Sequence, residues 1–147
     1  MKNYKKHICV FICFVVILSL SGCSRLREKK YYADTSNYIT GEAIVNNIIL
    51  YEDGGEQIIF WLGEIDDSYQ CSDFIVEGEN VSLLFERGIM DKVKIGDRIT
   101  FTSAPRYFGN GDFMPIVALS INGEELLSFE EGYSGLIDLY QSNKRVR

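Results

Sequence analysis

Beyond residue 37, the apolar residues fall in short runs rich in β-branched and aromatic side chains, and turn residues separate the runs. Runs of this kind predict β-strands. We expect five strands, at residues 38–51, 57–63, 74–76, 98–104 and 114–121. Asp53-Gly54-Gly55 and Asn110-Gly111 are hairpin signals, so the strands should be antiparallel. After a similar turn at Asn122-Gly123, a short returning strand is expected from Leu126 to Phe129.

Two segments change to a helical period. The first runs from Asn80 to Arg87, with Gly88 as its cap, and three apolar positions share one face: Val81, Leu84 and Phe85. Ser134 can cap a closing helix from Leu136 to Asn143. The predicted fold is therefore mainly β. The element order matches an OB-like five-stranded Greek-key barrel, with one helix between strands three and four and a short C-terminal helix. A small open β-sandwich would give a similar pattern.

The first residues follow another pattern. Lys2, Lys5 and Lys6 precede eleven consecutive apolar residues, Ile8 to Leu18. A basic start followed by such a run is typical of a secretory signal peptide. The run is shorter than the roughly 20 apolar residues of a transmembrane helix, so we expect residues 1–22 to be a signal peptide.

The run ends in Leu20-Ser21-Gly22-Cys23, which resembles the lipobox of bacterial lipoproteins: an aliphatic residue, two small residues and a cysteine. The resemblance implies cleavage after Gly22 and a diacylglyceryl group on the Cys23 thiol. Two acyl chains are enough for stable anchoring. The expected organisation is then a basic tether at 23–37, a domain at 38–143 and a basic tail at 144–147.

The domain is also similar to small OB-like lipoproteins of low-GC Gram-positive bacteria, in the stretch from Ile95-Gly96-Asp97 to Met114-Pro115-Ile116-Val117. This likeness brings no function with it. The anchor implies a cell-membrane location on the extracytoplasmic side.

Charge is unevenly spread along the chain. Residues 31–143 hold twenty acidic and five basic side chains, a net charge of −15, whereas residues 24–30 and 144–147 are each +3. Nucleic-acid affinity depends on neutralising phosphates, so a nucleic-acid partner is not expected. The basic stretch next to Cys23 should be attracted to anionic lipids or serve as a solvated tether.

The chain carries few reactive side chains beyond the signal. His7 is the one histidine, and it lies within residues 1–22. Its removal with the signal leaves no Ser-His-Asp or Cys-His site, so we expect neither an enzyme nor a zinc, copper or iron cofactor. Of the four cysteines, Cys9 and Cys13 leave with the signal and Cys23 carries lipid. Cys71 is then either a buried apolar residue or a partner for an intermolecular disulfide.

The loop between the fourth and fifth strands holds the candidate ligand contacts Arg106, Tyr107, Phe108 and Phe113. OB barrels bind chains of sugars or nucleotides with this loop and the adjoining sheet face. The same aromatic residues could instead pair across the hairpin.

Acidic residues occur in pairs along the domain, and the pairs are Glu52-Asp53, Asp66-Asp67, Glu124-Glu125 and Glu130-Glu131. They could bind Ca²⁺, run a carboxylate-based hydrolysis or be solvated surface charge. The sequence favours the last reading. We therefore expect a membrane-anchored, non-catalytic binding or accessory domain whose partner is an envelope protein or a glycan.

Overall fold

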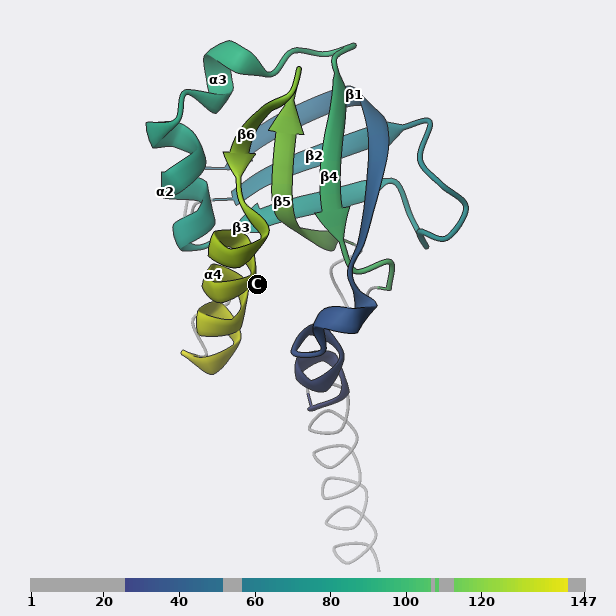
Figure 1. The fold of residues 1–147 in the computed structure, drawn as a ribbon, viewed down its shortest axis with the longest axis vertical. Coiled ribbons are helices and arrows are strands. Elements are labelled where there is room, and N and C mark those ends of the chain that lie inside the picture. The colour runs from purple at the N-terminus through teal and green to yellow at the C-terminus, as the bar shows by residue number, and fades with distance from the viewer. Residues whose placement is uncertain (1–25, 52–56, 107, 109–112, 143–147) are drawn as a thin grey trace, which may run out of the picture.

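The computed structural model describes residues 26–51, 57–106, 108 and 113–142. It is mainly β, with six strands in one sheet and helices around it (Figure 1). The strands are β1 (Ile39–Tyr51), β2 (Gln57–Gly63), β3 (Asp73–Glu77), β4 (Arg98–Ser103), β5 (Met114–Ile121) and β6 (Glu124–Leu127). The helical elements with printed bounds are η1 (Thr35–Asn37), α2 (Glu79–Glu86), α3 (Ile89–Lys92) and α4 (Phe129–Gln141). Residues 26–32 are also helical.

The strands pair in the order β3-β2-β1-β4-β5-β6. These neighbours are antiparallel, and β3 also pairs with β5 in parallel, where Phe74 lies opposite Met114. The long strand β1 serves two partners, since its first half pairs with β4 and its second half with β2. A bulge between Val45 and Asn47 bends β1 near this change. Figure 1 shows the result: β2 and β3 cross behind β4 and β5.

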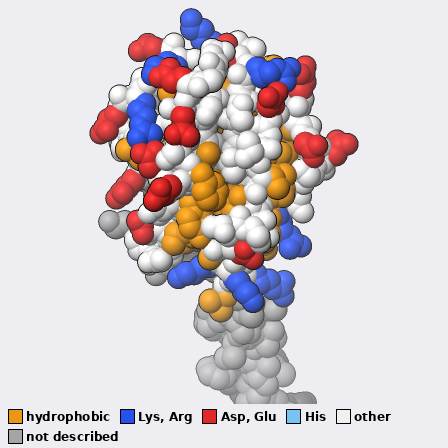
Figure 2. Space-filling model, in the orientation of Figure 1, with side chains coloured by type: hydrophobic (Ala, Val, Ile, Leu, Met, Phe, Trp, Pro, Cys, Tyr) orange, Lys and Arg blue, Asp and Glu red, His pale blue; other side chains and the backbone are white. Residues whose placement is uncertain are grey.

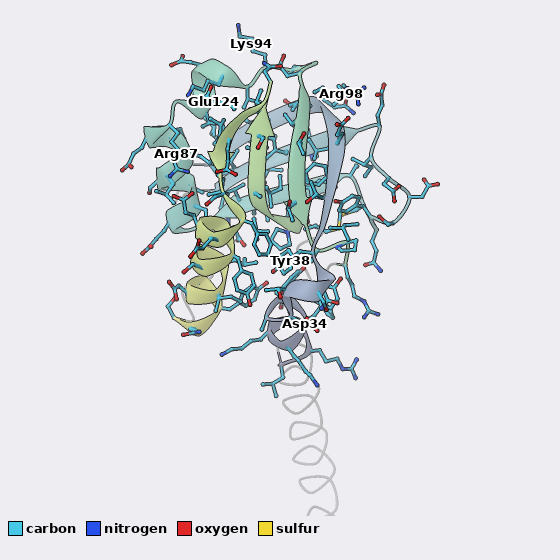
Figure 3. The ribbon with its side chains drawn as sticks, viewed as in Figure 1. Asp34, Tyr38, Arg87, Lys94, Arg98 and Glu124 are labelled. Carbon is cyan, nitrogen blue, oxygen red and sulfur yellow. The ribbon has the colours of Figure 1, made fainter. Side chains whose placement is uncertain are left out.

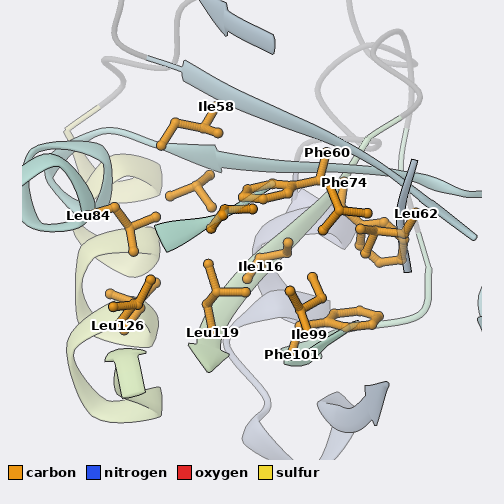
Figure 4. Close-up of a cluster of buried hydrophobic side chains, with 14 of the residues drawn as sticks. Ile58, Phe60, Leu62, Phe74, Leu84, Ile99, Phe101, Ile116, Leu119 and Leu126 are labelled. Carbon is orange, nitrogen blue, oxygen red and sulfur yellow. The ribbon is translucent and has the colours of Figure 1, made fainter. Parts of the chain in front are cut away.

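The main core lies between these two groups of strands. Side chains of β2 and β3 face those of β4 and β5, and α2 and β6 close one end (Figure 4). Phe60, Phe74 and Phe101 are at most 1 % exposed. The rings of Phe74 and Phe101 meet edge to face at 4.9 Å between centroids, an arrangement favoured by the quadrupoles of the two rings.

Several sequence predictions are confirmed. The structure contains strands at all five predicted places, and β2 and β5 have the predicted bounds. The helix between the third and fourth strands is α2, which buries Val81 and Leu84 while Phe85 stays 38 % exposed. At the Asn122-Gly123 turn both residues have positive φ, 52° and 81°, as a type I′ hairpin requires.

The prediction for the C-terminal region is wrong in its boundaries. The helix α4 begins at Phe129, seven residues before the expected start, and its cap is Ser128 rather than Ser134. The Ser128 hydroxyl and the Glu131 side chain form a capping box. The returning strand lies correspondingly earlier, at Glu124–Leu127. The low helix propensity of Gly132 and Gly135 hid this helix in the sequence.

The two glycines let α4 lie close to its neighbours. A Cβ at Gly132 would overlap the carbonyl oxygen of Val117 on β5, and a Cβ at Gly135 would overlap the side chain of Asn80 on α2. Asn80 is 2 % exposed, and its amide donates a 2.9 Å hydrogen bond to the Gly132 carbonyl oxygen. The close approach fixes α4 over the outer side of β5.

Candidate functional site

A cluster of aromatic side chains joins residues 26–38 to the domain. Tyr32 is 1 % exposed and belongs to a second buried cluster, with Ala104, Val117 and Leu136. Its ring stacks on that of Tyr140 at the end of α4, with 5.7 Å between centroids. Residues 26–37, which the sequence assigned to a tether, therefore include side chains buried against the domain.

Four tyrosine hydroxyls strengthen this contact. Three of them link residues 26–38 to other parts of the chain, and the fourth makes a hydrogen bond within residues 26–38. Tyr133 donates to the Ala33 carbonyl oxygen at 2.7 Å, and Tyr140 donates to the Glu28 carboxylate at 2.8 Å. Tyr32 donates to the carbonyl oxygen of Arg106 at 2.8 Å. Within the segment, the hydroxyl of Tyr38 donates to the Tyr32 carbonyl oxygen at 2.9 Å.

The protonation of Tyr38 suits its role as a hydrogen-bond donor. Burial, with repulsion from the neighbouring Tyr133 and Tyr31, raises the pKa of Tyr38 well above its usual range. Burial also raises the pKa of Tyr31 and outweighs the opposite effect of Arg106. Tyr38 lies where β1 meets the helical segment, beside Asp34 at the lower end of the molecule (Figure 3). Its hydroxyl stays protonated, and keeps its hydrogen bond, far above neutral pH.

The candidate loop contributes to the same end of the molecule. The guanidinium carbon of Arg106 lies 5.5 Å from the ring centroid of Phe108 and 6.0 Å from that of Tyr31. Phe108 also packs against Tyr31 and Tyr32, at 5.2 and 5.9 Å between centroids. Thus Arg106 and Phe108 come together around the helix at 26–32. Phe113 is half-buried just before β5.

Some of the expected residues lie outside the described part of the chain. These are the signal peptide at 1–22, Cys23, the Glu52-Asp53 pair, the turn at Asp53-Gly54-Gly55, Tyr107, the turn at Asn110-Gly111 and the tail at 144–147.

Sequence reasoning missed a second surface, on the outer side of β1, β2 and β3. Ile58, Phe60 and Leu62 point into the core, so the alternate residues of β2 face outwards. Trp61, 37 % exposed, lies opposite Asn47 on β1 and Asp73 on β3.

Tyr51 extends this surface along β1. It lies opposite Gln57 and is 49 % exposed. Between the two aromatic positions, Ile59 is aligned with Ile49 and Ile75. Ile59 and Ile75 are only 6 % and 4 % exposed, so the accessible apolar surface here belongs to Trp61 and Tyr51. We call this surface, made of the outward residues of β1, β2 and β3 around Trp61 and Tyr51, the Trp61 face. Because residues 58–62 are all apolar, the sequence pattern carries no signal for which side of the second strand is exposed.

The acidic pairs that the structure describes are partly matched by basic side chains. Glu124 lies 2.6 Å from Lys92, and Glu131 lies 2.6 Å from Arg87. Hydrogen bonds from Arg87 and Ser128 lower the pKa of Glu131 to about 2. Among the described residues, no three Asp, Glu, His or Cys side chains are grouped as metal ligands would be.

Cys71 was expected to be buried or paired between molecules. Its side chain is half-buried and packed against the main core. Its sulfur donates a 3.5 Å hydrogen bond to the Asp73 carbonyl oxygen.

Within the described ranges, the helices fall short of the length and apolar character that crossing a bilayer requires. Comparison of the chain with protein-family models, with curated proteins and with solved structures finds no match.

Proposed function

We propose that this chain is a lipoprotein of the extracytoplasmic side of the cell membrane, anchored through Cys23, and that its domain is a non-catalytic binding or accessory module. The anchor is supported by the lipobox-like Leu20-Ser21-Gly22-Cys23 and by the signal-like pattern before it. Mass spectrometry of the mature N-terminus tests this part. A diacylglyceryl Cys23 is the expected result, and an unmodified Cys23 or cleavage elsewhere would contradict it.

We further propose that the domain is an OB-like barrel. The support is the set of strand pairings, since β1-β2-β3-β5-β4 and back to β1 makes a ring of neighbours. The helix α2 follows β3 and precedes β4, as in OB barrels. In this proposal β6 and α4 are additions to the five-stranded barrel.

The observation that carries the binding role is the Trp61 face. Trp61 and Tyr51 offer exposed ring surface, which the apolar side of a sugar ring can cover. Asn47, Gln57 and Asp73 lie beside them and supply donors and acceptors for sugar hydroxyls. Of the two expected partners, an envelope protein or a glycan, we therefore favour a glycan. The net charge of −15 over residues 31–143 favours an uncharged glycan over an anionic one.

Trp61 is the one tryptophan of the chain, so its fluorescence reports on this face alone. The experiment titrates the lipidated protein, in detergent micelles, with uncharged glycan fragments released from envelopes. A saturable shift of the emission is expected. Calorimetry should find binding weakened at least tenfold by Trp61→Ala, as expected when an aromatic anchor is removed.

Phe85→Ala is the matched control, because Phe85 is 38 % exposed but lies on α2. It should leave the affinity unchanged. Thermal melting of both variants checks that they fold. An unchanged spectrum with every fragment would refute the glycan partner. If a photo-crosslinker at position 61 captured one envelope protein, the partner would be that protein instead of a glycan.

A further inference from the structure

One end of the molecule gathers exposed positive charge. Arg27, Lys29 and Lys30 on the helix at 26–32 are exposed, and so is Arg106. We call these four side chains, together with Leu26, the basic end. Figure 2 shows Lys and Arg side chains around this lower end, while most Asp and Glu side chains lie farther up. The basic end therefore differs in sign from the acidic remainder of the domain.

The orientation of the helix separates its charges. Glu28 and Tyr32 are one turn apart and face the domain, at 9 % and 1 % exposure. Leu26, Lys29 and Lys30 share the opposite face by the same spacing. Leu26 is 71 % exposed, more than any other large apolar side chain of the described residues. The helix thus turns its acid inwards and presents cations with one leucine outwards.

The helix is held to the domain rather than hanging from it. The Tyr133 hydroxyl donates to the carbonyl oxygen of Ala33, directly after the helix, and the Tyr140 hydroxyl donates to the Glu28 carboxylate. The ring of Tyr32 is stacked on that of Tyr140. Asp34 is the other acid of residues 26–38, and its carboxylate accepts hydrogen bonds from the backbone and hydroxyl of Ser36. Any surface that binds the outward face of the helix therefore fixes the orientation of the whole domain.

We propose that the basic end docks the domain directly onto an anionic lipid bilayer. This inference rests on the proposed anchor, since a lipid on Cys23 places the bilayer surface next to Leu26. Only two residues, Ser24 and Arg25, lie between the two positions, so the three steps of chain reach at most about 10 Å. Each Lys or Arg near an anionic surface strengthens the attraction about fivefold. Leu26 adds apolar area at the depth of the headgroups. The domain then lies on the membrane in one orientation instead of standing off it on a free tether.

Native lysines provide the test without any substitution. The lipidated protein is reconstituted in vesicles of phosphatidylcholine with or without one third phosphatidylglycerol, and the rate of lysine acetylation is followed by mass spectrometry. Lys29 and Lys30 belong to the basic end, whereas the exposed Lys94 lies at the opposite end of the molecule (Figure 3). Lys94 is therefore the internal control.

In the anionic vesicles, acetylation of Lys29 and Lys30 should be at least tenfold slower than acetylation of Lys94, after correction for the rates in detergent. Salt at 0.5 M should remove most of this protection, because it screens the attraction. Equal corrected rates at both ends would overturn the docking. Protection that is equally strong on phosphatidylcholine alone would overturn the role of anionic lipid. Flotation of the vesicles reports the anchor separately: protein that fails to float refutes the anchor, and protein that floats without protection refutes only the docking.

Discussion

Replacing Tyr32 by alanine should release the helix at 26–32 from the rest of the domain. The Tyr32 side chain is 1 % exposed, and its ring contacts those of Tyr31, Phe108 and Tyr140. Its hydroxyl donates to the carbonyl oxygen of Arg106. The main core does not include this ring, so the loss falls on the contact between helix and domain.

The size of the effect follows from the parts that are removed. Truncating a buried aromatic ring to alanine costs about 3–5 kcal/mol, and the hydrogen bond contributes about 1 kcal/mol of stability. A loss of about 4 kcal/mol favours the released state about a thousandfold, since each 1.4 kcal/mol is a factor of ten. The released fraction of molecules cannot exceed one, and this limits the change that can be observed. We therefore expect the released fraction to increase between ten- and a thousandfold.

Limited trypsin digestion measures the released population, because Arg27, Lys29 and Lys30 are cleavage sites that a docked helix protects. In the regime where opening is fast, the cleavage rate follows the open fraction. Tyr32→Phe is the matched control: it keeps the ring, loses only the hydroxyl bond, and should raise the rate about fivefold. An unchanged cleavage rate for Tyr32→Ala, in a protein that still melts cooperatively, would refute the role assigned to the aromatic cluster.

Two further predictions concern α4. Gly132→Ala should lower the free energy of unfolding by about 1–3 kcal/mol, because the added Cβ meets the Val117 backbone. Thermal melting measures this loss. The control is Ser134→Ala, on the exposed side of the same helix, which should be neutral or slightly stabilising. Since the pKa of Glu131 is lowered from 4.5 to about 2 by Arg87, the stability from this ion pair is present above pH 4.5 and is lost as the pH falls towards 2. Glu131→Gln should therefore flatten the acid side of the stability profile, and an unchanged slope of melting temperature between pH 4.5 and 2 would contradict this.

The strands were predictable because their patterns are local. In β5 the apolar run and the Asn122-Gly123 turn both lie within a few residues, and the predicted bounds agree with those found. In α4 the low propensity of Gly132 and Gly135 masked a capping box, Ser128 with Glu131, that was itself visible in the sequence. The capping box alone therefore predicts the start of this helix.

The candidate site was harder to predict because it depends on contacts between distant residues. Arg106 and Phe108 were chosen as ligand contacts from their own loop, but their partner Tyr31 comes from a segment 75 or more positions earlier. The division of β1 between two neighbouring strands likewise accompanies a bulge after Val45. The pattern of apolar and polar residues in β1 does not predict this bulge. For the same reason, the exposure of Trp61 could not be inferred from an uninterrupted apolar run.

The placement of β1 determines how the domain resists a pulling force applied at its N-terminal side. Tension on the chain ahead of residue 26 first loads the tyrosine bonds and the stacked rings of the helix at 26–32. Only after these yield does it reach β1, and there it acts along the strand. Because β1 is bonded to β4 through its first half and to β2 through its second half, sliding it out must shear two ladders together. A force on the N-terminal side of the domain is therefore opposed by both ladders of β1 at once.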